Sequence, residues 1–192
     1  MKVLIVNHSY PPHPGRGSAA SVQDLAEELI KRDVEVVVAN ARGTDETVTR
    51  SLAGVKVYDL PHEPTPLKAL DEVIAFERPD IVHTVSIMAF SVRAWQIARH
   101  HKIPIVHGLC EYFLLCRRQT LFSGGRICRH LCLGCDTDAA GRREASGQVD
   151  AVVAVSRHTL QRHLDLDFFP NARQKKVIYT GIDAPVRAAH SA

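Results

Sequence analysis

Residues 2–18 read KVLIVNHSYPPHPGRGS and contain the clearest structural pattern in the chain. Val3 to Val6 form an uninterrupted apolar run, which is typical of a strand covered on both faces of a parallel sheet. A turn rich in proline and glycine follows, and apolar residues at helical spacing begin after Ser18. This order of strand, turn and helix predicts the first unit of a Rossmann-like α/β domain.

The same alternation of strand and helix continues along the chain. Short apolar runs bounded by turn residues predict strands, and apolar residues three and four positions apart predict helices. This order favours a doubly wound parallel sheet of about seven strands with helices on both faces. The further predicted strands are 34–39, 55–60, 80–85, 103–108, 151–155 and 175–179, and the predicted helices are 18–30, 67–75, 89–101, 136–147 and a short one capped by Ser156.

These elements predict one Rossmann-like domain at residues 1–183. Residues 110–135 follow the fifth strand, and we interpret this polar segment as a cysteine-rich insertion. Residues 184–192 lack periodicity and are expected to be a tail or the start of an interdomain linker.

Composition excludes several classes of protein. The net charge of the 192-residue chain is +3 and its charges are interspersed, so no nucleic-acid partner is expected. No apolar run reaches the roughly 18 residues needed to cross a bilayer, and the N-terminus does not resemble a signal peptide. We therefore expect a cytoplasmic protein with reduced cysteines, and a peripheral membrane contact is left open.

Candidate ligand-binding residues follow the predicted strands, because ligands of doubly wound sheets bind at the carboxyl ends of the strands. After the first strand, Gly15, Arg16 and Gly17 lead into a helix, where free backbone N–H groups attract anions. Ser86 and Ser156 follow two other strands. The loop lacks the third glycine of the dinucleotide fingerprint, which argues against NAD.

Four cysteines form the strongest chemical signal. Cys116, Cys128, Cys132 and Cys135 have the spacing C-x11-C-x3-C-x2-C. In a reducing compartment, four clustered thiolates indicate a tetrahedral metal site, with structural zinc favoured over an iron–sulfur cluster. The alternative is a loop with unligated cysteines.

Three stretches resemble the N-terminal half of GT-B glycosyltransferases of the family-4 type. They are HSYPPHPGRG at residues 8–17, IVHGLCEYFLLCRR at residues 105–118 and VIYTGID at residues 177–183. The resemblance covers essentially the whole chain. It implies an acceptor-binding half of a hexosyltransferase that moves a sugar from a nucleotide-sugar to a hydroxyl of a saccharide or lipid-linked acceptor, with retention. In such enzymes the second half holds most of the donor and no catalytic metal is needed. We therefore expect the chain to carry half an active site and to be inactive alone.

The fifth strand departs from the family pattern at its end. Where the family has an active-site His and Asp, this sequence has Cys110 and Glu111. A thiol replaces an imidazole only if its pKa is lowered. His107 is a candidate substitute, and the competing interpretation is a histidine packed at the edge of the core. The resemblance thus assigns a catalytic role to Cys110, Glu111 or His107.

Two other functions remain open from the sequence. One is a stand-alone Rossmann-like module that binds a ligand without turnover. The other is a metal- or redox-sensing protein that uses the cysteine cluster.

Overall fold

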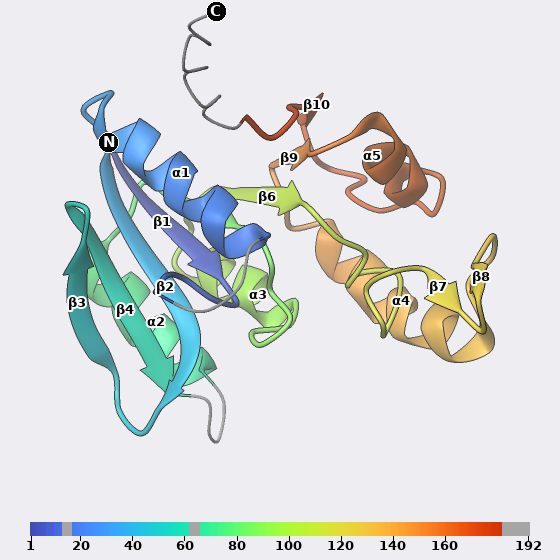
Figure 1. Cartoon of the computed structure of the whole chain (residues 1–192), viewed down its shortest axis with the longest axis horizontal. Helices are drawn as coiled ribbons and strands as arrows, with labels where there is room; N and C mark the ends of the chain where they lie inside the picture. Colours follow the sequence, from blue (N-terminus) through green and yellow to red (C-terminus); the bar gives the residue numbers. More distant parts are fainter. Residues whose placement is uncertain (13–16, 62–65, 182–192) are drawn as a thin grey trace, which may run out of the picture.

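A computed structural model of the chain describes residues 1–12, 17–61 and 66–181 (Figure 1). Its main sheet has eight strands in the order β10-β9-β6-β5-β1-β2-β4-β3, and all neighbours are parallel except β3 and β4. The predicted fold class, a doubly wound parallel sheet with helices on both faces, is confirmed. The strands are β1 (Lys2–Asn7), β2 (Glu35–Thr44), β3 (Val48–Leu52), β4 (Val55–Pro61), β5 (Ile81–Thr84), β6 (Ile105–Leu109), β9 (Ala151–Ala154) and β10 (Gln174–Val177).

Helices cover the sheet on two sides and divide the core into two layers. Side chains of α1 pack with alternate residues of β1, β2 and β4, whereas residues of the other helices pack against the opposite face. Figure 1 shows α1 in front of the sheet and α2 and α3 behind it. Alternation along β1 explains the division, since Leu4 and Val6 face one layer and Val3 and Ile5 the other. The helices are α1 (Ser18–Ile30), α2 (Leu67–Glu77), α3 (Arg93–His100), α4 (Leu133–Ser146) and α5 (Arg157–Leu164).

The edge strand β3 was not predicted from the sequence. Its residues VTRSL place three polar side chains between Val48 and Leu52 and are mostly exposed, so it lacks the apolar run that marks the other strands. It pairs antiparallel with β4, and Arg50 Nε donates to the buried carboxylate of Asp59 over 2.6 Å. The ion pair, the ladder to β4 and the partial burial of Leu52 hold this strand.

The chain between β6 and α4 leaves the sheet and forms a small hairpin. Strands β7 (Phe122–Ser123) and β8 (Arg126–Ile127) pair antiparallel, and the turn between them consists of Gly124 and Gly125. Both glycines have positive φ values of 58° and 74°, which favour glycine. In Figure 1 this hairpin and the start of α4 lie away from the sheet, on the side toward which the β6 arrow points.

No helix among the described residues is long and apolar enough to cross a membrane. The proposed tail at residues 184–192 lies outside the described residues.

Candidate functional site

Asn7 links two loops at the carboxyl edge of the sheet. It is the last residue of β1 and is fully buried. Its Oδ1 accepts the backbone N–H of Ser86 over 2.9 Å, and its Nδ2 donates to the backbone carbonyl of Ser9 over 2.7 Å and to Ser18 Oγ over 3.4 Å. One side chain therefore fixes the loops after β1 and β5 and the start of α1.

The predicted anion loop is described only in part, because Gly15 and Arg16 lie outside the described residues. Gly17 directly precedes α1 with φ of 106°, a conformation that favours glycine. A Cβ at this position would meet no atom of the described residues within 4 Å, so these residues leave space there for a ligand. Its role in substrate binding stays a prediction.

The two predicted serine sites have structural partners. Ser86 is buried, and its N–H is held by Asn7. Ser156 caps α5 as the sequence predicts, since its Oγ accepts the N–H of Thr159 over 3.0 Å. Both lie after strands at the carboxyl edge, and no described contact tests whether they bind substrate.

His107 lies within the core, which favours the packing interpretation over a catalytic one. Its side chain is 3% exposed, and its Nδ1 is 2.8 Å from Thr84 Oγ1. Trp95 contacts it edge-on at 5.0 Å between ring centroids, and Phe169 stacks on it at 5.8 Å. Burial lowers the pKa of His107 to about 3, with a further contribution from His163 and His83. The imidazole is therefore neutral at pH 7 and enclosed by aromatic rings.

The surroundings of Cys110 disfavour the thiolate form of its side chain. It packs against the apolar layer that contains Tyr10, Val22 and Val85. Burial raises the pKa of its thiol to about 12, and the charge of Glu111 adds to the shift. A thiol that stays protonated at neutral pH is a weak nucleophile.

Glu111 has the properties that suit proton transfer. It lies two residues beyond the end of β6, is half-buried, and its Oε2 accepts the backbone N–H of Phe113. Burial raises the pKa of its carboxyl to about 7, against the lowering effects of that hydrogen bond and of Arg142. Such a group exchanges a proton readily near neutral pH.

Arg142 is a neighbour that sequence reasoning missed. Its guanidinium donates to the carbonyl of Phe113 and lies 4.2 Å from the centroid of the Phe113 ring. Burial is the main cause of the lowered pKa of Arg142. Because Arg142 comes from the middle of α4, no local pattern could indicate its contact with the end of β6.

The predicted metal site at the four cysteines stays a prediction. The thiol of Cys135 interacts with those of Cys116 and Cys132, so three of the four side chains are neighbours. Within the parts of the chain that the structure describes, however, no three His, Cys, Asp or Glu side chains are arranged to hold a metal ion. The donor atoms suit zinc, but their placement does not support a four-cysteine site.

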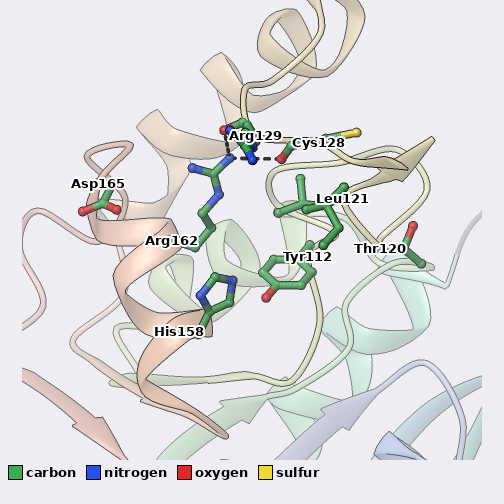
Figure 2. A pocket seen from close by; sticks show the side chains of 9 residues that line it. Tyr112, Thr120, Leu121, Cys128, Arg129, His158, Arg162 and Asp165 are labelled. Atoms are coloured by element: carbon green, nitrogen blue, oxygen red, sulfur yellow. Dashed lines mark hydrogen bonds between the residues drawn. The ribbon is translucent and has the colours of Figure 1, made fainter. Parts of the chain in front are cut away.

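Residues 110–132, between β6 and α4, contain the β7–β8 hairpin and are called the hairpin segment. A pocket lies between this segment and α5 (Figure 2). Its volume is about 490 Å³. Figure 2 shows Arg162 reaching from α5 to the segment, where its Nη2 donates to the carbonyls of Cys128 over 3.4 Å and Arg129 over 2.5 Å. The pocket is lined by Tyr112, Thr120, Leu121, Ile127, Cys128, Arg129, His158, Arg162 and Asp165.

Comparison with known proteins assigns the family. The sequence profile of glycosyltransferase family 4 matches residues 15–185. The chain belongs to glycosyltransferase family 4. A curated relative, an uncharacterised 42.6 kDa protein in the cps region of Klebsiella pneumoniae, is 25% identical over 212 positions that cover 97% of this chain and 57% of the relative. The chain thus spans little more than half of that protein.

Solved structures share the fold of this family-4 chain. Sucrose-phosphate synthase from Thermosynechococcus elongatus matches 93% of this chain and 47% of its own, with a TM-score of 0.64 and 12% identity. HepE of Anabaena, solved with UDP-glucose, matches 95% and 44% with a TM-score of 0.60 and 15% identity. MnaA of S. aureus, solved with UDP, matches 94% and 43% with a TM-score of 0.56 and 16% identity. At these identities the likeness shows the fold alone.

Proposed function

We propose that this family-4 chain is the acceptor-binding half of a glycosyltransferase that moves a sugar from a nucleotide-sugar to a hydroxyl group, with retention. The family match over residues 15–185 carries the proposal. The structures of HepE with UDP-glucose and of MnaA with UDP support a nucleotide-sugar as the donor. We place the reaction in the cytoplasm.

The carboxyl edge of the sheet supplies the groups for this function. Glu111 is half-buried with a pKa near the working pH, so it is the residue to accept or return the proton of the acceptor hydroxyl. The open backbone before α1 is suited to contact an anionic group of the donor. Rate enhancement then rests on positioning the acceptor and on stabilising the leaving diphosphate, without a catalytic metal.

The test compares the chain alone with the chain joined to the remaining part of a family-4 transferase. Each protein is incubated with a panel of nucleotide-sugars and hydroxyl acceptors, and release of the nucleoside diphosphate is measured. We expect turnover only from the joined protein, because the donor is held mainly by the other half. Turnover by the isolated chain would refute the half-site proposal, and no turnover by a folded joined protein with any donor would refute transfer.

Zinc binding by the cysteine segment stays a prediction from the spacing of Cys116, Cys128, Cys132 and Cys135. The chemistry of the four thiolates, which suit tetrahedral zinc, supports it. Elemental analysis of protein purified without added metal is expected to give about one zinc per chain. Cys132→Ser should lose the metal and Cys110→Ser should keep it. Absence of zinc and iron, with all five cysteines titrating as free thiols, would contradict the prediction.

A further inference from the structure

The pocket beside α5 has one cationic side and one apolar side. Arg129, His158 and Arg162 contribute the cations or potential cations, and Tyr112, Leu121 and Ile127 contribute apolar surface. Tyr112 is one residue from Glu111, and His158 lies in the first turn of α5, two residues from Ser156. The pocket therefore adjoins the residues that follow β6 and β9 at the carboxyl edge of the sheet.

Arg129 and Arg162 both have N–H groups that are available to a ligand. Arg162 uses only its Nη2 on the carbonyls of Cys128 and Arg129, so its Nε and Nη1 have no hydrogen-bond partner among the described residues. Neither atom is among the buried polar atoms that lack a partner, so both are accessible from the pocket or from solvent. Arg129 is exposed, and within the described ranges its guanidinium forms no ion pair or hydrogen bond. A planar guanidinium with free N–H groups binds phosphate in a bidentate manner.

Carboxylates that could neutralise these arginines are scarce. Residues 112–135 contain four arginines and no Asp or Glu, although Arg117 is paired with Asp138 of α4 and only Arg129 of the four lines the pocket. Asp165 is the one carboxylate in the pocket wall, and its Oδ1 accepts from Gln161 Nε2 over 2.7 Å. In Figure 2, Asp165 lies on the other side of Arg162 from Tyr112 and Leu121. The local field therefore favours an anion beside the apolar side chains.

Apolar surface continues from the pocket onto the hairpin. Phe122 and Ile127 are a directly paired cross-strand couple, so their side chains share one face of the hairpin. They are 49% and 77% exposed, although large apolar side chains gain from burial. Arg126 pairs with Ser123 on the opposite face and does not line the pocket. Exposed apolar surface next to unpaired cations fits a ligand that is both apolar and anionic.

We propose that this pocket binds an acceptor that carries a phosphate group on an apolar chain. The phosphate lies against Arg129 and Arg162, and the apolar chain lies along Leu121, Ile127 and Phe122. The acceptor hydroxyl is then held near Glu111. This inference rests on the proposed function for its assignment to an acceptor, but the binding itself requires neither a donor nor turnover.

The test measures binding to the full chain by isothermal titration calorimetry, with octyl phosphate below its micelle concentration as the probe. We expect saturable binding at one site. Octyl glucoside lacks the charge and inorganic phosphate lacks the chain, so each should bind at least about tenfold more weakly. Octyl glucoside that binds as tightly as octyl phosphate would overturn the proposal.

Two exposed arginines of the hairpin segment provide matched variants. Arg129→Gln should raise the Kd for octyl phosphate at least about tenfold, because a charged hydrogen bond is lost. Arg126→Gln removes the same charge from the opposite face and should change the Kd less than about twofold. Ile127→Ser should weaken octyl phosphate but leave inorganic phosphate unchanged. Equal effects of the two arginine variants would overturn the assignment of the phosphate to this pocket.

A membrane surface is the other source of phosphate on an apolar chain. Vesicles of phosphatidylglycerol distinguish it from a soluble acceptor. One outcome is that the two arginine variants weaken vesicle binding equally while octyl phosphate shows no saturable binding. That result would assign the arginines to a membrane surface and overturn the proposal. If the joined enzyme transfers sugar to neutral saccharides and the chain does not bind octyl phosphate, the proposed ligand of the pocket is refuted. The proposed function then still stands.

Discussion

Replacement of Glu111 by glutamine is expected to lower kcat of the joined transferase by about a hundredfold or more, the range typical for loss of a general acid or base. Glutamine keeps the shape and can still accept the N–H of Phe113 through its Oε1, but it cannot exchange a proton at neutral pH. The wild-type kcat/KM should change around pH 7, where the carboxyl titrates, and this step should be absent from the variant.

Loss of folding would not explain such a result. Because burial raises the folded-state pKa of Glu111 from 4.5 to about 7, the stabilisation tied to its proton is fully present below pH 4.5 and is lost as pH rises through 7. At pH 8 the wild-type chain holds a half-buried carboxylate, so Glu111→Gln should be at least as stable in urea. Glu28→Gln, which changes an exposed carboxylate on α1, is the matched control and should transfer sugar normally. A kcat of Glu111→Gln within about threefold of wild type would refute the role.

The fold was largely predictable from the sequence because each buried strand carries its own apolar signal. Strand β1 is buried on both faces and reads as a continuous apolar run. Strand β3 gives no such signal, because its stability comes from pairing with β4 and from the contact of Arg50 with Asp59. An edge strand of this kind depends on partners that are distant in sequence.

The sequence predicted where the candidate site lies, but not which of its residues have suitable chemistry. Strand order alone put Glu111, Ser86 and Ser156 at one edge of the sheet, since ligands of this fold bind there. Burial could not be read from the pattern, and it separates the three candidates of the fifth strand: His107 is enclosed by aromatic rings, Cys110 stays protonated, and Glu111 titrates near pH 7. Arg142 and Arg162 reach the site from helices far along the chain, so their contacts required the folded arrangement.

Acid is expected to destabilise the domain through buried histidines, of which His107 and His163 lie side by side with Phe169. His163 is fully buried, its Nδ1 is 2.8 Å from the carbonyl of Thr159, and its Nε2 has no hydrogen-bond partner among the described residues. Burial lowers the pKa of His163 to about 4, with a smaller effect of Arg162, and that of His107 to about 3. A depressed pKa means that the stabilisation is present above pH 6.5, the unfolded value, and is lost as pH falls toward the folded values.

Between pH 7.5 and pH 5, each of these histidines should remove about 2 kcal/mol from the free energy of unfolding. The variant His107→Asn/His163→Asn should be less stable at pH 7.5, because it loses packing against Trp95 and Phe169, yet it should lose about 4 kcal/mol less than wild type on going to pH 5. Glu111 shifts stability in the opposite direction, and His83, whose pKa burial also lowers to about 4, shifts it in the same direction. Both residues are present in both proteins, so their effects cancel in the comparison. Urea unfolding at the two pH values measures the difference. The control is His100→Asn, which alters an exposed histidine on α3 and should follow the wild-type pH dependence. If the double variant also follows the wild-type dependence, neither His107 nor His163 controls acid stability.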